Sequence, residues 1–434
     1  MRKIWPAIVI AVLLAPVVYR LSWGETSESP TGKTEITYMA WGYPSQLGTE
    51  RRLIEKFHEE NPDIHVRFIM APMSSYYDKV GIMFASGTAP DIMRVNPQHF
   101  AAYVRMGYLK DLEPLMEADA GYNPEDFFPA ARDAGLYNRR HYALGVLFTR
   151  GLVYYNKTAF EEAGVEEPWD AYRAGRWHWG DLVETARRLT IRDEESGRPL
   201  QYGINFIGRI YNVFDVAMSN GGRILSDDGS EAYLDSPEVL DAANWILDLR
   251  RKWHVAPTPE QGAMALFSFE SGRLAMEIDS SGESPRLRDA ITDFEWDVAP
   301  TPYGSEGAGS SHGAHLLVMN AATKKAGAAW RFMTFVTGPT AERLLGVELR
   351  RCIPTRREIA FSEEYLSADE PPFNMRAFVA DIDMPVRQVE VTEKWNEWTT
   401  EFQAYLDQIW LGGRPPEEAL READERIDRI LRDS

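Results

Sequence analysis

The residues that first suggest chemistry are the serines and histidines of the stretch GSSHGAH at 309–315. Gly309–Gly313 matches the G-x-S-x-G pattern, in which a serine nucleophile sits on a sharp turn between a strand and a helix. In that fold an acid and then a histidine follow the serine, whereas here His312 and His315 follow Ser311 with no acid before them. The pattern also follows a Gly- and Ser-rich loop rather than a strand. The order of the residues therefore argues against a serine hydrolase.

The sequence also has no specific motif for a zinc site or for a glycosidase. His312 and His315 lack the i,i+4 spacing and the glutamate of the zinc motif H-E-x-x-H. The 66 acidic residues guarantee many carboxylate pairs, so no pair stands out as the acid and base of a glycosidase. Cys352 is the only cysteine and is expected to be a small buried hydrophobic residue. We expect no catalytic residue, no metal and no cofactor, with a surface glycosidase kept as an alternative.

Composition favours a soluble globular protein of two domains. A chain of 434 residues exceeds the size at which one hydrophobic core keeps growing. The net charge of −19 argues against binding to nucleic acid or anionic lipid, which requires basic surfaces. The chain holds 13 tryptophans, and aromatic rings stack on the apolar faces of sugars. Four of them lie at apolar positions and are expected in the core: Trp177, Trp245, Trp253 and Trp330.

The N-terminus has the pattern of an export signal. Arg2 and Lys3 precede the apolar run Ile4–Val18, which is short for a membrane span and typical of a signal peptide. No A-x-A cleavage site follows and Arg20 comes soon after the run, so an uncleaved anchor stays open. No cysteine follows the run in a position to take a lipid. We expect residues 1–23 to be a signal peptide or anchor and 24–34 a polar linker.

Strand-like and helix-like segments alternate in the first third of the chain. The predicted strands and helices are Glu35–Met39, Glu50–Glu60, Ile64–Phe68, Tyr76–Ser86, Ile92–Val95 and Gln98–Met106. Such alternation predicts an α/β fold with a parallel sheet and helices on both faces. Ligands of these sheets bind beyond the carboxyl ends of the strands, where Trp41, Asn96 and Gln98 lie.

The stretch Gly145–Gly164 separates this unit from a second one. Its apolar runs Gly145–Phe148 and Leu152–Tyr155 predict strands, and Thr158–Ala163 predicts a short helix that ends at Gly164. The later predicted helices and strands are Trp179–Leu189, Tyr202–Phe206, Asn212–Ser219, Ser236–Trp253, Ala263–Ser271, Leu274–Ile278, Phe294–Val298, Leu316–Met319, Lys324–Phe335, Lys394–Ile409 and Pro416–Leu431.

Five collinear segments carry a family resemblance. They are the G-x-x-P-D run from Gly87, YYNKTAFEEAG from Tyr154, the W-to-LT helix from Trp179, FESGRLAM from Phe269, and IPTR from Ile353. Together they resemble the family 1 extracellular solute-binding proteins of ABC importers, the group that contains maltose-binding protein. Each motif is weak alone, but the five occur in order across about residues 36–430.

The resemblance implies a two-lobe periplasmic-binding-protein fold of the type II kind, with three hinge crossings that close around a ligand. The crossings are expected near Val146–Thr149, Asp279–Ser281 and Val336–Pro339. The first lobe would then comprise residues 35–147 and 282–337, and the second lobe residues 148–281 and 338–434. The implied protein is a monomer outside the cytoplasm, in the periplasm or on the outer face of the membrane.

The resemblance also implies a ligand and a site. A mono- or oligosaccharide would bind in the cleft and pass to the permease subunits of an importer, with no part for nucleic acid. The implied ligand-binding residues are Trp41, Asn96, Gln98, Tyr155, Arg209, Tyr211, Asn212, Asp279, Ser280, His312, Gly313, Trp395 and Trp398, with one of the last two expected in the cleft. This chain reads SHG at 311–313, where the family often has G-G. Another small polar solute, such as a glycerol-phosphate held by Arg94 or Arg209, is the alternative ligand.

Overall fold

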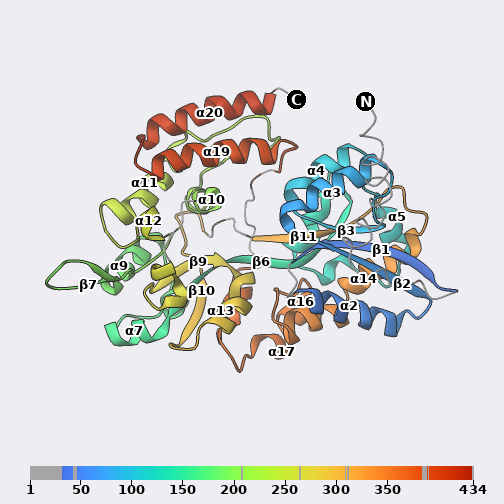
Figure 1. Cartoon of the computed structure of the whole chain (residues 1–434), viewed down its shortest axis with the longest axis horizontal. Helices are drawn as coiled ribbons and strands as arrows, with labels where there is room; N and C mark the ends of the chain where they lie inside the picture. Colours follow the sequence, from blue (N-terminus) through green and yellow to red (C-terminus); the bar gives the residue numbers. More distant parts are fainter. Residues whose placement is uncertain are drawn as a thin grey trace, which may run out of the picture.

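A mixed sheet runs through the middle of the molecule (Figure 1). The computed structural model describes residues 32–42, 46–206, 209–262, 265–307, 309, 312–383, 389 and 391–432. The sheet has seven strands in the order β10-β6-β11-β3-β1-β2, with β9 also paired to β6. These strands are β1 Thr34–Trp41, β2 Ile64–Ala71, β3 Ile92–Val95, β6 Ala143–Asn156, β9 Met276–Ser280, β10 Trp296–Pro300 and β11 His312–Met319.

The prediction of a parallel sheet is correct only for the first three strands. β1 pairs parallel with β2 and β3, but β11 pairs antiparallel with both β3 and β6. The sequence pattern of alternating strands and helices could not reveal β11, because this strand arrives from a distant part of the chain. An antiparallel strand added to a parallel sheet is common in α/β proteins.

β6 is the element that joins the two halves of the molecule (Figure 1). The two apolar runs predicted as separate strands form this one strand of 14 residues, in which every side chain except Thr149 is buried. Residues 143–150 of β6 pair with β11, whereas residues 151–156 pair with β9 and β10. Gly145 lies so close to the neighbouring chain that an added Cβ would be 2.3 Å from the carbonyl oxygen of Ala131. β6 therefore runs through the core of both halves.

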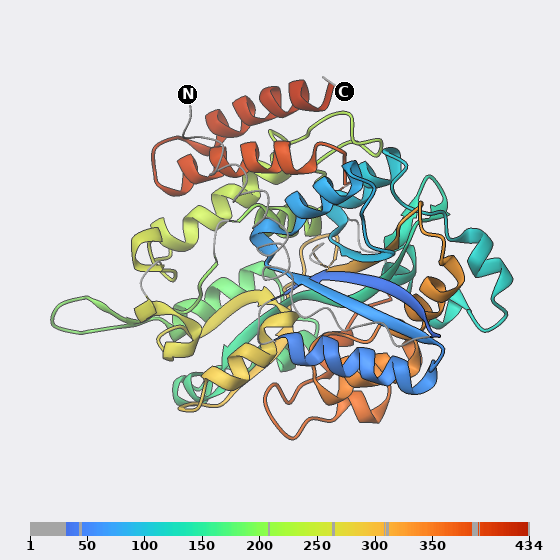
Figure 2. The ribbon, with the colours of Figure 1, turned by 45° about the vertical axis from the view of Figure 1, so that its right-hand side comes forward.

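Helices cover both faces of β1, β2 and β3 (Figure 2). The long helices here are α2 Leu47–Glu60, α3 Met73–Ala85, α4 Pro97–Arg105, α5 Glu113–Ala118 and α14 Ala326–Val336. On one face, Phe57 of α2 packs edge-on against Phe332 of α14, with ring centroids 5.0 Å apart. α3 and α4 pack on the opposite face. We call this half, with β1–β3 and the helices just named, the first lobe.

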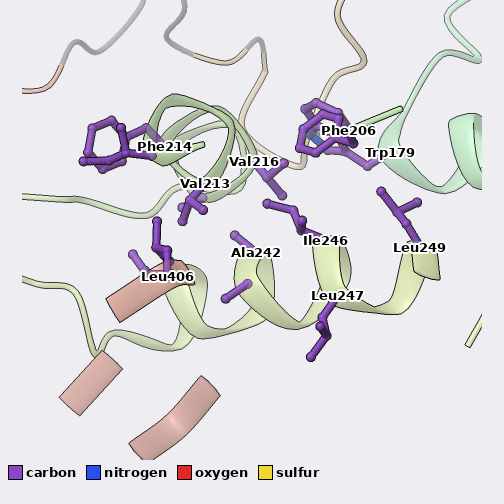
Figure 3. Close-up of a cluster of buried hydrophobic side chains, with 14 of the residues drawn as sticks. Trp179, Phe206, Val213, Phe214, Val216, Ala242, Ile246, Leu247, Leu249 and Leu406 are labelled. Carbon is purple, nitrogen blue, oxygen red and sulfur yellow. The ribbon is translucent and has the colours of Figure 1, made fainter. Parts of the chain in front are cut away.

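The second lobe holds β9, β10 and a larger helical core. Its helices are α7 Lys157–Ala163, α8 Pro168–Arg173, α9 Trp179–Leu189, α10 Ile210–Ser219, α11 Pro237–Arg251, α12 Pro259–Gly262, α13 Ser284–Ala290, α19 Trp395–Trp410 and α20 Pro416–Arg432. Figure 3 shows Val213 and Val216 of α10 pointing toward Ala242 and Ile246 of α11. Leu406 of α19 joins the same cluster, so the C-terminal helices complete this core.

Short elements connect these parts. They are α6 Pro129–Arg132, β4 Leu136–Tyr137, β5 Arg140–His141, β7 Ile191–Arg192, β8 Pro199–Gln201, α15 Pro339–Glu342, a π-helical turn Arg343–Glu348, α16 Arg357–Ala360, α17 Glu363–Leu366 and α18 Arg376–Val379, with 3-10 turns Pro124–Asp126, Asp133–Gly135, Ala265–Phe267, Phe269–Ser271 and Ser281–Glu283.

Two predicted elements differ in the structure. The helix predicted for Ala263–Ser271 begins with two residues that lie outside the described ranges, and its described part consists of two 3-10 turns, because Ser268 between them has an extended backbone. The strand predicted for Tyr202–Phe206 is reduced to single bridges at Tyr202 and Asn205. At Gly203 this segment passes very close to α9, since an added Cβ would be 2.0 Å from the carbonyl oxygen of Ala186.

The packing differs from the predicted lobe boundaries in two places. β10 lies within the range assigned to the first lobe, yet it pairs with the part of β6 that belongs to the second. Leu344, Leu345 and Cys352 lie in the range assigned to the second lobe, yet they pack in a core of the first. The positions of the hinge crossings stay predictions.

All four tryptophans expected in the core pack in or against the cores, with Trp177 and Trp330 buried and Trp245 and Trp253 partly buried. Within the described ranges, no helix combines the length and the apolar composition that a membrane crossing requires. The predicted signal peptide, residues 1–23, and most of the predicted linker lie outside the described residues.

Candidate ligand-binding site

A cleft of about 1160 Å³ lies between the two lobes. Its floor is formed by Thr149–Gly151 of β6 and the end of β9 at Ile278–Ser280. One wall comes from α4, the segment 130–138 and the start of β11 at Gly313–His315, and the other from α10, the loop 227–230 and the start of α19. The cleft therefore draws its lining from both lobes and from the strands that connect them.

Most of the residues predicted to bind the ligand line this cleft. They are Asn96, Gln98, Arg209, Tyr211, Asn212, Asp279, Ser280, Gly313 and Trp395. Asn96 follows β3 and is the N-cap residue of α4, and Arg209 is the N-cap residue of α10. Two helices thus begin at the cleft, one in each lobe, and the first turn of each carries polar side chains toward the ligand space. Contact of these residues with a ligand stays a prediction.

Tyr155 and Trp398 are corrections to the predicted site, since both belong to a core rather than to the cleft lining. Tyr155 is 1% exposed, and its hydroxyl donates to a carboxylate oxygen of Glu167 at 2.7 Å. Trp398 is fully buried and packs with Phe214. Trp395 and Trp398 are three residues apart on α19, and the helix turns only the first of them to the cleft.

The two remaining predicted residues are His312 and Trp41. The backbone of His312 pairs with Arg150 of β6, and its side chain is not described. Trp41 is partly exposed but does not line the cleft. Its ring packs edge-on against His315, with centroids 5.0 Å apart, and His315 does line the cleft. The structure therefore places Trp41 behind His315, as a support for the wall.

A buried charge network holds this wall in place. Glu50 of α2 and Arg94 of β3, each almost fully buried, form an ion pair at 2.7 Å, and Arg351 reaches the same carboxylate oxygen at 3.3 Å. Arg94 also donates to the carbonyl oxygen of Trp41 and lies 4.7 Å from the centre of its ring. Arg94, considered above as a phosphate ligand, is thus committed to the interior of the first lobe.

The network sets the protonation of the groups around it. Burial pushes the pKa of Glu50 upward, but the nearby guanidinium groups of Arg94 and Arg351 outweigh burial and hold it below its ordinary value. For His315, burial and the same two arginines all act in one direction and lower its pKa to about 3. His315 is therefore a neutral imidazole at physiological pH. Sequence reasoning considered His315 only as a catalytic histidine and as a metal ligand, and missed its place in the cleft.

The lobes touch across one rim of the cleft. Gln98 of α4 donates through Nε2 to the hydroxyl oxygen of Tyr211 on α10, at 3.2 Å. Arg105 at the end of α4 forms an ion pair with Glu393, just before α19. These contacts join the two walls directly, so they belong to a closed or nearly closed arrangement of the lobes.

Removing the rim ion pair should have a small effect on binding. We expect Arg105→Gln to weaken the binding of a cleft ligand by no more than about fivefold, because exposed ion pairs contribute roughly 0.2–1 kcal/mol. The difference from the wild type should vanish at high salt, where exposed charges are screened. Titration calorimetry at low and high salt measures both. A loss above about twentyfold that persists in salt would mean that Arg105 contacts the ligand itself.

Acidic groups outnumber basic groups around the cleft. The acidic lining residues are Asp133, Asp215, Asp227, Asp228, Asp279 and Glu393, and the basic ones are Arg105, Arg150, Arg209 and Lys394. Burial raises the pKa of Asp279 on the floor, and it raises the pKa of Glu277 beside it to about 7, with a contribution from Asp279. This balance disfavours a doubly charged anion and suits a neutral ligand.

Comparisons with known proteins agree with this architecture. A family model described as bacterial extracellular solute-binding protein matches residues 42–343. An ABC substrate-binding protein of Listeria monocytogenes, solved with cycloalternan, is 26% identical, with a TM-score of 0.80 and coverage of 92% of this chain and 99% of that one. A cyclic alpha-maltosyl-1,6-maltose binding protein of Arthrobacter globiformis shares the fold at 20% identity, with a TM-score of 0.77 over 93% and 100% of the two chains.

A further similar protein is a curated relative found by sequence. The sn-glycerol-3-phosphate-binding periplasmic protein of Shigella dysenteriae is 26% identical over 431 residues, covering 89% of this chain and 90% of that protein. The family model covers well over half of the chain, and the cleft between two α/β lobes lies at the place where the family resemblance puts its ligand site. The chain therefore belongs to the bacterial extracellular solute-binding protein family.

Proposed function

We propose that this protein is the substrate-binding protein of an ABC importer and that it binds a mono- or oligosaccharide in the cleft. The size of the cleft is the main support for this proposal. Its volume of about 1160 Å³ exceeds the range of about 300–1000 Å³ that is usual for small-ligand pockets. An oligosaccharide fits such a space. The Listeria and Arthrobacter neighbours, whose ligands are cyclic sugars, support this ligand class.

The proposed mechanism is closure without a chemical reaction. A sugar that contacts Gln98 in the first lobe and Tyr211 or Arg209 in the second binds the closed state better than the open one. The closed protein then docks on the permease subunits and releases the sugar to them. No step requires a metal or a cofactor.

A glycerol-phosphate is the second candidate ligand, favoured by the Shigella relative and by Arg209 at the start of α10. A phosphate is well bound by a helix N-terminus together with an arginine. The excess of carboxylates around the cleft opposes a dianion, so the sugar is the preferred ligand.

A thermal-shift screen tests the ligand class. Glucose, maltose, maltotriose, cycloalternan and sn-glycerol 3-phosphate are the probes. A ligand at 100 times its Kd stabilises the native state by about 2.7 kcal/mol. For a chain of 434 residues that corresponds to a rise in Tm of roughly 3 °C. We expect the rise with a neutral sugar, and a rise with glycerol 3-phosphate alone would contradict the proposal.

Closure predicts a change in size. The radius of gyration from small-angle scattering should fall when the sugar from the screen is added at saturation, because the lobes rotate toward each other about the connecting strands. The same sugar added to a variant that no longer binds it serves as the control. An unchanged radius at saturation would mean that the lobes do not move on binding.

We also propose export to the extracytoplasmic side through the N-terminal apolar run Ile4–Val18, with the protein as a monomer. Cell fractionation of the host should find the protein outside the cytoplasm. Mass spectrometry of its N-terminus distinguishes cleavage between Ser22 and Ser29 from an uncleaved anchor. A purely cytoplasmic protein would rule the proposal out.

A further inference from the structure

We propose that His315 and Gln98 form a subsite that binds a hydroxyl group of a neutral ligand, through His315 Nδ1 and Gln98 Oε1. The inference rests on the proposed sugar-binding function and identifies part of the wall that recognises the sugar. It adds a residue, His315, that neither the motifs nor the composition pointed to as a binding residue.

Two unsatisfied atoms in the cleft wall carry the proposal. His315 Nδ1 and Gln98 Oε1 are buried, and neither has a hydrogen-bond partner among the described residues. Both residues line the cleft. Buried polar atoms in native proteins are nearly always hydrogen-bonded, so an orphaned atom in a ligand cleft indicates a partner that arrives with the ligand.

The fold brings the two side chains to one edge of the first lobe. β11 pairs antiparallel with β3 so that Leu316 lies opposite Val95, the last residue of β3. His315 precedes Leu316 and Asn96 follows Val95, so both lie at this end of the strand pair. Gln98 follows two residues later, in the first turn of α4. Both side chains are therefore mounted on regular elements at the same sheet edge.

Each side chain is also held in place. Trp41 packs against the His315 ring with centroids 5.0 Å apart, and Arg94 fixes Trp41 through its carbonyl oxygen. Gln98 is oriented by the hydrogen bond from Nε2 to the Tyr211 hydroxyl, which leaves Oε1 as the free acceptor. A preorganised pair of this kind selects a ligand at little cost in conformational freedom.

The chemistry of the pair fits a hydroxyl group and opposes a phosphate. The charged groups that face His315 are Arg94 of β3 and Arg351, and Glu50 of α2 is paired to both of them. Together with burial, the positive charges of the two arginines keep the imidazole neutral. A hydroxyl group has one donor and two acceptor positions, so it can donate its proton to the amide oxygen of Gln98 and accept a hydrogen bond from His315 Nδ1 in the tautomer that carries the proton on Nδ1. A dianionic phosphate offers only acceptors, and its oxygens would meet the acceptor oxygen of Gln98.

Calorimetry on three variants tests the subsite, with the neutral sugar that gives the largest thermal shift among glucose, maltose, maltotriose and cycloalternan. His315→Leu keeps a similar size and removes the nitrogen, so we expect at least about tenfold weaker binding. His315→Gln restores a polar group and should recover most of the affinity. Gln98→Met should also lose about tenfold, and Tyr211→Phe should lose less, because it removes only the partner of Nε2.

A second readout separates binding from a structural role. A set of monodeoxy analogues of the sugar should contain one that binds the wild type about tenfold more weakly but binds His315→Leu no more weakly than the parent sugar does. The ratio of the affinities of wild type and His315→Gln should also stay constant between pH 5 and 8. Denaturant melts establish that each variant is folded, and Gln98→Met carries the test if His315→Leu does not fold.

The outcomes distinguish this inference from the proposed function. If the wild type binds a neutral sugar and His315→Leu and Gln98→Met bind it within about twofold of the wild type, the subsite is wrong and the function stands. The subsite is also wrong if every deoxy analogue loses the same affinity in the wild type and in His315→Leu. If the wild type binds no neutral sugar, or only glycerol 3-phosphate, both the proposed function and the subsite are wrong.

Discussion

Replacing Glu50 with glutamine should lower the free energy of unfolding by about 3–5 kcal/mol. Glu50 is the single carboxylate between Arg94 at 2.7 Å and Arg351 at 3.3 Å, and it is almost fully buried. Without its charge the buried guanidinium group of Arg94 and the partly buried one of Arg351 lose the carboxylate that both of them contact. Such a loss of one partner costs far more than the intact network contributes.

Denaturant unfolding measures the effect, and Glu55→Gln on the exposed side of the same helix is the matched control. Glu55→Gln should change the free energy of unfolding by no more than about 0.5 kcal/mol, because the Glu55 side chain is exposed. Because the fold lowers the pKa of Glu50 from its ordinary value of 4.5, its contribution is present above that value and is lost as the pH falls through the folded pKa. The difference between wild type and Glu50→Gln should therefore shrink only in acid. Equal effects of the two substitutions would contradict the role given to the network.

Trp398→Ala should cost a similar amount of stability, about 3–5 kcal/mol, because it leaves a large cavity in a well-packed core. Trp398 is fully buried, packs near Phe214, and donates through Nε1 to the hydroxyl of Thr392 at 3.1 Å. The sugar affinity of the folded variant should stay within about threefold of the wild type, since the ring does not line the cleft.

Trp395→Ala is the matched comparison on the same helix. Trp395 lines the cleft, but it is only 5% exposed and packs against Trp398 with ring centroids 5.0 Å apart, so Trp395→Ala should also lower the stability. The affinity distinguishes the two variants, because the loss of an aromatic anchor at a binding hot spot costs about 2 kcal/mol or more, a factor of roughly 30 in affinity. Denaturant melts and calorimetry on both variants separate the two roles. If Trp398→Ala loses affinity as Trp395→Ala does, while keeping its stability, the assignment of the two rings is reversed.

The elements with strong local signals could be predicted from the sequence. The helix predicted at Trp179–Leu189 has those bounds in the structure, where His178 and Asp181 form a capping box at its start. Gly164, predicted to end α7, has the left-handed backbone that such an end requires, with φ of 62°. The sheet order could not be predicted in the same way, because β11 joins β3 across more than 200 residues of sequence.

The candidate site, like the fold, could be predicted from the sequence only in part. Asn96 could be placed by its position after a predicted strand, whereas Arg209 was placed by the family resemblance. Tyr155 and Trp398 were misplaced because a motif locates a segment but not the direction of each side chain. The network of Glu50, Arg94 and Arg351 joins residues 44 and 301 positions apart, a separation at which no periodic pattern exists. His315 was missed for a related reason, since the predicted strand began one residue after it.

The central claim is that a neutral sugar bridges the two lobes in this cleft, and a crystal structure of the complex tests it most directly. Crystals would be grown with the neutral sugar that gives the largest thermal shift. We expect the sugar to lie between the first turns of α4 and α10, with one hydroxyl group hydrogen-bonded to Gln98 and His315 and with further contacts to Tyr211 or Arg209. A sugar bound outside the cleft, or one that touches only a single lobe, would contradict it.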